Sequence, residues 1–385
     1  YIAILGRQPA LGMAELERLY GAGQTRWFSD ESAVIKTNRM DFTQLGGSMK
    51  AGKVIMETNG GWGDVSRALV DHYVKAWDET DHKITLGISA YGFKVTARDV
   101  QKTGIILKQR LKKELVSVRL VPNEFPALNT AASHHNKLGL TKNKVEIIIV
   151  RAGNGAVMVA ESIGAQNIDA FAGRDQARPH TDAFVGMLPP KLARIMVNMA
   201  GLQKGALLDP FCGTGVVLQE ALLNGFTVNG TDLSEKMVDY TQKNLQWFMR
   251  KYKPGGKVGV VRQGDAMDHL WEFKVSGIVS ETYLGQPFSA PPRPEKLAEV
   301  RGNCNHIVST FLKNAAQQFN KDTPLVLAVP AWRAKNGEIT HLPLIQNLSR
   351  LGFERIALQH VRPDELLYYR DTQVVARELL ILVKK

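Results

Sequence analysis

The sequence predicts an α/β protein whose carboxyl-terminal half contains a doubly wound sheet and whose amino-terminal half is a smaller α+β region. A short apolar run at residues 206–208 is followed by a loop with two glycines and by a helical pattern at 216–224, which is the order strand, loop, helix. A second strand at 226–231 ends in an acidic residue about twenty positions after that loop. Residues 325–330 form an unbroken apolar run, which is typical of a strand buried inside a sheet.

Composition sets outer bounds on the class of protein. The chain has 385 residues, of which 44% are hydrophobic and 22% charged, so we expect a globular protein with two or three domains. No apolar run is long enough to cross a bilayer and no secretory signal is visible, which predicts a cytoplasmic protein with no membrane partner. The two cysteines indicate neither a disulfide framework nor a metal site. The net charge of +12 favours a polyanionic partner.

The amino-terminal half alternates short strands with amphipathic helices. Residues 1–60 are expected to form a small α+β domain, with strands at 1–6, 33–36 and 53–57 and a helix at 13–20. Residues 61–165 are expected to form a second domain. Its predicted helices are 65–77 and 104–118, and its predicted strands are 84–91, 117–121, 144–151 and 155–162.

Cations are frequent in this second domain. The helix at 104–118 has Leu107, Leu111, Leu115 and Val118 on one face and Lys108 and Lys112 on the others, which indicates either a solvated face or contacts to a polyanion. Lys137 and Lys142 follow the adjacent histidines at 134 and 135. Neighbouring side chains on a strand point to opposite faces, and no cysteine or carboxylate stands at ligand spacing. We therefore expect phosphate contacts here and no metal.

A linker is expected at 166–190. It contains Arg174, Asp175 and Arg178, and it ends in Pro189 and Pro190, which suit the start of a helix leading into the carboxyl-terminal half.

The segment Leu-Leu-Asp-Pro-Phe-Cys-Gly-Thr-Gly at 207–215 is the most specific stretch of the chain. Its glycines, Gly213 and Gly215, allow the backbone to approach a ligand closely, and the helix that follows offers free N–H groups. The dinucleotide pattern GxGxxG is absent because Leu218 occupies the third glycine position. Asp232, at the end of the next strand, is positioned as in folds that hold a ribose diol.

This segment resembles motif I of class I S-adenosylmethionine-dependent methyltransferases, in the form used by RNA N-methylases. The order Arg-Asp…Arg-Pro at 174–179 and Pro-Lys-Leu-Ala-Arg at 190–194 is similar to that of THUMP-containing tRNA guanine N2-methyltransferases. The amino-terminal half resembles, in element order alone, a ferredoxin-like domain followed by a THUMP domain. The resemblance implies a Rossmann-like methyltransferase domain with a mixed seven-stranded sheet over 191–385.

The resemblance also implies roles for individual residues. S-adenosylmethionine would be the cofactor, with its methionine part on the glycine loop, its ribose on Asp232 and its adenine at Asp265 and Ala266, which follow a strand at 257–262. A carboxylate such as Asp265 is otherwise a common turn former. The cofactor residues are Asp209, Phe211, Gly213, Thr214, Gly215, Asp232, Leu233, Asp265 and Ala266. The residues expected to contact tRNA are Arg174, Asp175 and Arg178 at the entrance, with Lys108, Lys112, Lys137 and Lys142.

The expected catalytic segment departs from the family pattern. After a strand at 277–280, the family has Asp or Asn followed by Pro-Pro-Tyr, whereas this chain has Glu281, Thr282, Tyr283 and Leu284. A carboxylate can accept hydrogen bonds from an exocyclic amine and take its developing positive charge, and an aromatic ring can stack on a flipped base. Glutamate is one methylene longer than aspartate. Either the loop is rebuilt around Glu281 with the same outcome, or another acceptor is used, or the chain binds without catalysing.

The remaining elements complete the predicted fold. Helices are expected at 235–250, 294–301, 307–319 and 345–351, and the last two strands, 353–360 and 373–383, are expected to pair antiparallel. Tyr368, Tyr369 and Arg370 lie between those strands and either contact nucleic acid or cap the sheet edge.

Together these features predict an enzyme that methylates the N2 amine of a guanosine in tRNA, at position 10 by the resemblance. The alternatives are methylation of another RNA or DNA base, or a silent tRNA-binding protein. The resemblance further suggests a small zinc-containing activator subunit, which some relatives need, and we expect a monomer or weak oligomer.

Overall fold

The computed structural model describes residues 1–77, 82–182 and 188–385. It divides into two compact units. The amino-terminal unit contains Tyr1–Pro9, Tyr20–Thr43 and Ser48–Ala170, and the carboxyl-terminal unit contains Ala10–Leu19, Gln44–Gly47 and Phe171–Lys385. Part of the predicted linker at 166–190, residues 183–187, lies outside the described residues, while its start forms helix α5 (Ile168–Gln176).

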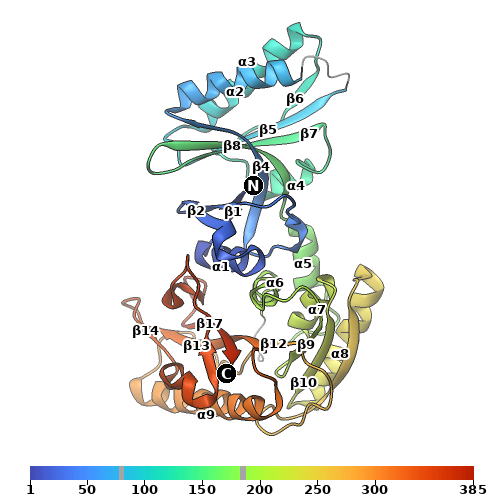
Figure 1. The fold of residues 1–385 in the computed structure, drawn as a ribbon, viewed down its shortest axis with the longest axis vertical. Coiled ribbons are helices and arrows are strands. Elements are labelled where there is room, and N and C mark those ends of the chain that lie inside the picture. Colours follow the sequence, from blue (N-terminus) through green and yellow to red (C-terminus); the bar gives the residue numbers. More distant parts are fainter. Residues whose placement is uncertain (78–81, 183–187) are drawn as a thin grey trace. The chain divides into compact units, whose positions relative to one another are not determined.

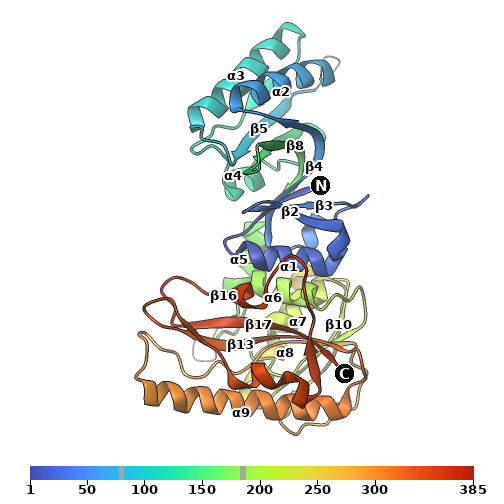
Figure 2. The same ribbon diagram turned by 60° about the vertical axis from the view of Figure 1, so that its left-hand side comes forward.

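The amino-terminal unit is built on one mixed sheet, whose order among the described residues is β2-β3-β1-β4-β8-β7-β5-β6. Two helices, α2 (Trp62–Ala76) and α3 (Ala97–Lys113), lie side by side on one face (Figures 1 and 2), where their apolar stripes pack on β5, β7 and β8. The short helix α4 is Thr130–His135. The strands are β1 Ile2–Leu5, β2 Thr25–Ser29, β3 Ser32–Ile35, β4 Ser48–Asn59, β5 Ile84–Tyr91, β6 Val118–Leu120, β7 Lys144–Arg151 and β8 Ala156–Ala165.

Strand β4 joins the two domains that the sequence separates at residue 60. It pairs antiparallel with β8 from Lys50↔Ala165 to Asn59↔Ala156, and with β1 on its other side. The predicted strand, 53–57, covers only the middle of β4, because the small and polar residues around it hide the alternation. The structure therefore places both sides of that boundary in one sheet.

Helix α3 begins and ends earlier than the 104–118 expected from its leucines. A capping box at its start, in which Thr96 and Asp99 satisfy each other's backbone N–H groups, fixes the amino-terminal end. After the helix ends at Lys113, Leu115 has a φ of 64° and is 94% exposed, so its assignment to the buried face is wrong. Val118, also assigned to that face, belongs to β6.

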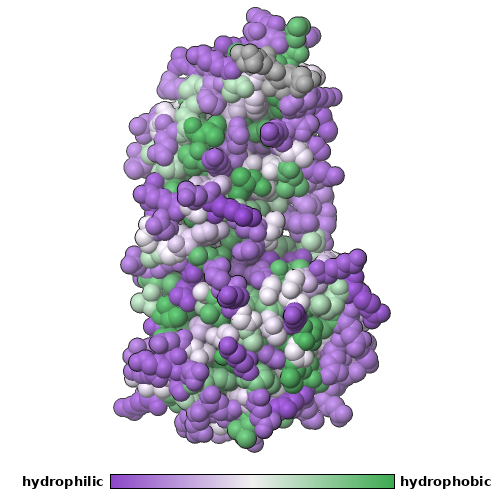
Figure 3. Space-filling view, turned by 45° about the vertical axis from the view of Figure 1, so that its right-hand side comes forward, coloured by the Kyte–Doolittle hydropathy of each residue, from purple (hydrophilic) through white to green (hydrophobic). Residues whose placement is uncertain are grey.

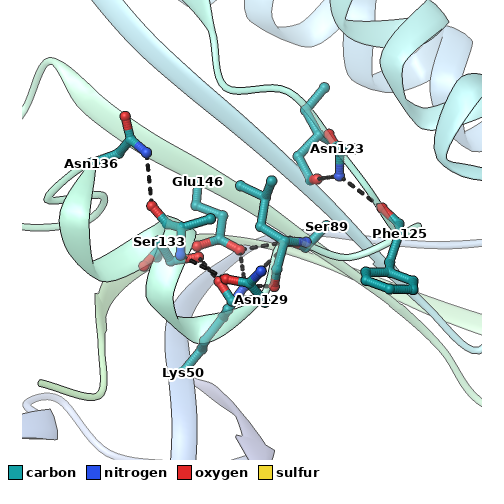
Figure 4. Close-up of polar contacts among 12 residues, drawn as sticks. Lys50, Ser89, Asn123, Phe125, Asn129, Ser133, Asn136 and Glu146 are labelled. Atoms are coloured by element: carbon teal, nitrogen blue, oxygen red, sulfur yellow. Dashed lines mark hydrogen bonds and ion pairs between the residues drawn. The ribbon is translucent and has the colours of Figure 1, made fainter. Parts of the chain in front are cut away.

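A buried ion pair lies on the sheet of this unit (Figure 4). The Lys50 ammonium donates to the Glu146 carboxylate and, at 2.7 Å, to the Leu128 carbonyl. Ser89 donates to the same carboxylate at 2.6 Å and accepts from the Leu128 N–H at 2.9 Å. These bonds connect β4, β5 and β7 to the loop before α4, and all of those to Glu146 are made by its Oε1, while its Oε2 is buried without a partner among the described residues.

The carboxyl-terminal unit has the predicted mixed sheet, with the order β11-β10-β9-β12-β13-β17-β15 among the described residues and two short strands, β14 and β16, attached to it. Strands β9, β10, β11, β12 and β13 run parallel to one another, while β17 runs antiparallel between β13 and β15, as the sequence predicts for the last two strands. The strands are β9 Ala206–Asp209, β10 Thr227–Asp232, β11 Lys257–Gln263, β12 Gly277–Glu281, β13 Pro324–Arg333, β14 Ile339–Thr340, β15 Phe353–Arg355, β16 Leu367–Tyr368 and β17 Val375–Lys384.

Helices cover this sheet. They are α6 (Pro190–Met199), α7 (Val216–Leu223), α8 (Glu235–Tyr252) and α9 (Pro294–Gln318). Figure 2 shows α9 running along one side of the sheet below β13 and β17. The sequence predicts two helices here, at 294–301 and 307–319, and this is wrong. Buried Val300, Cys304 and Val308 recur every four residues across the polar segment between them, so packing on the core keeps one continuous helix.

Helix α1 (Pro9–Tyr20) contributes most of its length to the carboxyl-terminal unit, although the sequence assigns it to the first domain. The carboxylate of Glu15 accepts from the N–H groups of Gly46 and Gly47, each at 2.8 Å, and from Asn198 Nδ2 at 2.6 Å. These contacts to residues distant in the sequence allow the Glu15 carboxylate to be buried. The helical pattern of the segment gives no sign of them.

The described residues contain no helix long and apolar enough to span a bilayer. Figure 3 shows one face of the molecule, on which hydrophilic residues predominate and apolar residues form scattered patches.

Candidate active site

Three adjacent parallel strands of the carboxyl-terminal unit each end in a carboxylate. The final residues are Asp209 of β9, Asp232 of β10 and Glu281 of β12. Strand β9 lies between the other two, with Asp209 opposite Gly230 on one side and Leu208 opposite Ile278 on the other. Ligands of open α/β sheets bind at the carboxyl ends of the strands. This edge is therefore the candidate site.

The glycine loop begins directly after β9. Gly213 and Gly215 have φ values of 52° and 84°, which only glycine adopts readily, and Gly215 is the N-cap of α7. A Cβ on Gly215 would lie 3.1 Å from the Thr241 side chain of α8, so the loop also depends on a close approach. The sequence prediction of a tight strand-to-helix turn is confirmed.

Asp232 reaches this loop from β10. Its Oδ2 accepts from the Gly213 N–H at 2.8 Å and its Oδ1 accepts from the Ser234 N–H at 2.9 Å. Burial raises the pKa of this carboxyl, while the two N–H donors oppose the rise. Asp232 thus links the second strand to the glycine loop.

Asp209 is almost completely buried. Its Oδ1 accepts from Ser280 Oγ on β12 at 2.6 Å and from the Phe211 N–H at 3.2 Å. Burial raises the pKa of Asp209 to about 7, and the charges of Asp232 and Glu281 add to this rise. The three carboxylates are therefore close enough to interact electrostatically. The sequence gives no indication of Ser280, because a serine inside a strand has no distinguishing spacing.

The other predicted cofactor residues surround this edge. Asp265 forms a turn, with its Oδ1 accepting from the Met267 N–H at 2.9 Å, and Ala266 is buried beside it. Leu233 is 66% exposed next to Asp232. The ring of Phe211 packs edge-on against the ring of Phe311 of α9, with 5.3 Å between the centroids, so it is part of the hydrophobic core. The roles of these residues toward a cofactor remain predictions.

The predicted catalytic segment is arranged around an ion pair that the sequence does not indicate. Arg377 Nε on β17 donates to Glu281 Oε1, and the two side chains are only 7% and 13% exposed. Burial raises the pKa of Glu281, and Arg377 opposes the rise. Thr282 donates its N–H and its hydroxyl to the Ala328 carbonyl at 3.0 and 3.2 Å, so its side chain is committed to the sheet. Tyr283 is 45% exposed, as a stacking surface requires.

The expectation that Arg174 and Arg178 line an entrance needs correction. Arg174 is buried, and its guanidinium donates to Glu220 of α7 at 2.6 Å, so its charge already has a partner. Arg178 is also buried and donates to Thr214 Oγ1 in the glycine loop at 3.2 Å. Asp175 is partly exposed. A buried Glu220 needs cationic partners, and the sequence alone does not reveal which arginines supply them.

The four lysines predicted to contact tRNA are all exposed on the amino-terminal unit, but they fall into two pairs. Lys108 and Lys112 lie on α3, which packs on one face of the sheet. Lys137 and Lys142 follow α4. The leucines on either side of α4 lie close to Gly87 of β5, on the face of the sheet opposite α3. The structure therefore does not gather them into one patch.

The segment between the last strands is tied to the sheet edge. The Arg333 guanidinium stacks on the Tyr369 ring at 3.9 Å and donates to the carbonyls of residues 370, 371 and 373. Tyr368 belongs to β16 and pairs with Arg377. Of the two roles left open for Tyr368 and Tyr369, these contacts favour capping of the edge.

A separate groove lies on the outer side of the same unit. It has a volume of about 910 Å³ and lies between α8 and β11, where residues such as Leu245, Met249, Arg250 and Lys257 line it. None of its lining residues is one of the predicted site residues, so we do not assign the cofactor to this groove.

The strand order, the glycine loop and the acidic strand ends define a class I methyltransferase fold. Residues 178–331 match the family described as RMKL-like, methyltransferase domain. The probable tRNA (guanine(10)-N2)-dimethyltransferase of Methanothermococcus thermolithotrophicus is 47% identical over 145 residues, which are 35% of this chain and 86% of that protein. This chain belongs to the tRNA (guanine(10)-N2)-dimethyltransferase family.

Two further relatives are named tRNA (guanine(10)-N2)-dimethyltransferase. That of Methanothermobacter thermautotrophicus is 42% identical over 127 residues, covering 32% of this chain and 36% of the relative. That of Methanocaldococcus jannaschii is 32% identical over 174 residues, covering 43% of this chain and 47% of the relative. The matched part of the chain thus spans less than half the length of these two relatives.

Proposed function

We propose that this protein transfers a methyl group from S-adenosylmethionine to the N2 amine of guanosine 10 in tRNA. The observation that carries the proposal is the row of carboxylates at the ends of β10, β9 and β12, with the glycine loop beside it. Family membership supports the reaction class, and the relatives' names supply the acceptor.

The residues at this edge fit a cationic ligand. Burial raises the pKa values of both Asp209 and Asp232, and the charge of Asp232 adds to the cost of ionising Asp209. A ligand with a positively charged amine and a sulfonium would offset that cost. Asp209, Gly213 and Gly215 would hold the methionine part, Asp232 the ribose, and Asp265 with Ala266 the adenine. When bound there, S-adenosylmethionine supplies an electrophilic methyl group on sulfur.

Glu281 and Tyr283 would receive the acceptor base. The exocyclic amine of guanine is a poor nucleophile because its lone pair is conjugated with the ring. A carboxylate that accepts its hydrogens localises the lone pair and balances the positive charge that develops on nitrogen. Glu281 has Oε2 available for this, since Arg377 engages Oε1. The exposed ring of Tyr283 would stack on the flipped base.

We further propose that the amino-terminal unit is a ferredoxin-like and THUMP region that binds tRNA in the cytoplasm. Its exposed lysines on α3 and after α4 would contact phosphates. The elements of the unit fit such a region in order, and the chain's charge of +12 favours a nucleic-acid partner. A small zinc-containing activator subunit remains part of the proposal.

The test is methyl transfer from labelled S-adenosylmethionine to an unmodified tRNA transcript, followed by nucleoside analysis. We expect N2-methylguanosine or its dimethyl form at position 10. A different methylated nucleoside, or methylation of a DNA duplex offered in parallel, would contradict the acceptor assignment. Absence of incorporation with cofactor binding intact, in both the isolated protein and cell extract, would support the silent tRNA-binding alternative.

A further inference from the structure

The ion pair between Glu281 and Arg377 follows from the register of three strands. Glu281 lies opposite Ala328 of β13, and Ala328 lies opposite Leu379 of β17. Opposed residues share a face of the sheet, and so do residues two apart on one strand. Arg377 therefore lies on the face of Glu281, two residue pairs beyond the end of β12.

This face is the one opposite helix α9. Ile278 and Leu380, which pack in the core with α9, are each an odd number of positions from Glu281 and Arg377 along their strands. The neighbouring Glu378 points to the other face, where it pairs with Arg355 at 2.8 Å and with His341 at 2.6 Å. Two adjacent residues of β17 thus serve two separate ion pairs.

The charges around Glu281 are unbalanced without Arg377. Asp209 on β9 is near enough for the charges of Glu281 and of Asp232 on β10 to raise its pKa. Among the described residues, Arg377 is the cation that directly opposes the effect of burial on Glu281. Removing it would leave the Glu281 carboxylate buried without the cation that opposes the effect of burial, which favours protonation.

We propose that Arg377 is a positioning residue for the reaction, which holds Glu281 ionised and directs its second oxygen at the acceptor amine. This inference rests on the proposed function. A glutamate side chain has one more torsion than an aspartate, so its carboxylate needs an anchor. The Arg377 Nε–H fixes one oxygen, Oε1, and leaves Oε2 to the acceptor. The anchor takes the place of the rigid prolines that the family has at this loop.

The test compares Arg377→Gln and Arg377→Lys with the unchanged protein in methyl transfer to tRNA over a range of pH. Because only the ionised Glu281 accepts from the amine, activity falls as pH decreases through its pKa. Without Arg377 that acid limb moves to higher pH by about 1 to 3 units. The kcat at neutral pH falls by about a hundredfold, as expected for a displaced catalytic group. The KM for S-adenosylmethionine changes little, and Arg377→Lys recovers part of kcat.

Arg355→Gln is the matched control. It removes the neighbouring ion pair on the opposite face of β17, while His341 still accompanies Glu378. It should leave the acid limb where it is. An acid limb that shifts equally in both glutamine variants would mean that the effect comes from general loosening of β17, and an unchanged limb in Arg377→Gln would overturn the inference.

A second measurement does not depend on turnover. Infrared difference spectra can follow the protonated carboxyl of Glu281 with pH, with the band identified by its loss in Glu281→Gln. The titration midpoint should be higher in Arg377→Gln than in the unchanged protein, and equal midpoints would overturn the proposal. If the midpoints differ but tRNA receives no methyl group from the unchanged protein, the proposed function fails and the electrostatic role of Arg377 stands.

Discussion

The two halves of the candidate site hold their carboxylates by different means. In the cofactor half, Asp232 accepts from the N–H groups of Gly213 and Ser234, and all three residues lie within or near one strand-loop-helix unit. In the acceptor half, Glu281 is held by Arg377, which is 96 positions later in the chain. Backbone donors in a loop persist through most side-chain changes, whereas a guanidinium is lost by a single substitution. The cofactor half should therefore tolerate mutation better than the acceptor half.

The largest effect is expected for Glu281→Gln. The amide keeps the size of the side chain but loses the charge that balances the developing cation, so kcat should fall by about 10² to 10⁴-fold. Binding of S-adenosylmethionine, measured by calorimetry, should change little because that half is held separately. Glu272→Gln is the control, since the Glu272 side chain is 80% exposed on the same unit. A loss of cofactor affinity equal to the loss of kcat would contradict the claim that the cofactor and acceptor halves of the site are held separately.

Asp209→Asn should reduce the pH dependence of stability. The folded-state pKa of about 7 lies above the ordinary value, so the folded protein retains a proton that the unfolded chain releases. The free energy of unfolding then decreases as pH rises towards 7, with a slope of up to roughly 1.4 kcal/mol per pH unit from this group. Denaturant unfolding between pH 5 and 8, without cofactor, should show a smaller slope in the variant. An identical slope would show that Asp209 is ionised throughout.

Asp232→Ala should lower the affinity for S-adenosylmethionine by about 10 to 100-fold, because the charge-assisted hydrogen bonds to the ribose are lost. The single-turnover rate at saturating cofactor should remain within a fewfold of the original. Asp239→Ala provides a matched control, because Asp239 is an exposed aspartate that pairs only with Lys243 on α8. An unchanged affinity in Asp232→Ala would show that Asp232 does not bind the ribose.

Tyr283→Ala should have the smallest effect. Stacking on an aromatic ring contributes roughly 1 to 3 kcal/mol per base, so the KM for tRNA should rise about 5 to 100-fold. Tyr283→Phe keeps the ring and should retain nearly normal KM. If Phe and Ala behave alike, the hydroxyl matters and stacking does not.

The sequence predicts the cofactor half better than the acceptor half for a physical reason. The glycine loop, Asp209 and Asp232 are fixed by local spacing, because strand ends and helix starts are adjacent in the chain. The mixed sheet of the carboxyl-terminal unit follows from the family resemblance of this segment. The pairing of Arg377 with Glu281 depends on register across β12, β13 and β17, which no short pattern records.

Buried tertiary contacts account for the differences at the linker arginines and at helix α9. Arg174 and Arg178 are of a residue type common in RNA-binding segments. In the structure, however, Arg174 donates to Glu220 and Arg178 donates to the glycine loop, both inside the carboxyl-terminal unit. Helix α9 continues through a glycine and two asparagines because buried Cys304 holds that turn on the core. In each case tertiary contacts override a local preference that the sequence does show.

The most direct test of the central claim uses two tRNA transcripts that differ only at position 10, one with guanosine and one with inosine. Inosine lacks the N2 amine and keeps the rest of the base. We predict methyl transfer to the guanosine transcript, its loss in Glu281→Gln, and none to the inosine transcript, which should still compete for binding. Equal incorporation into both transcripts would contradict the claim that Glu281 serves the N2 amine.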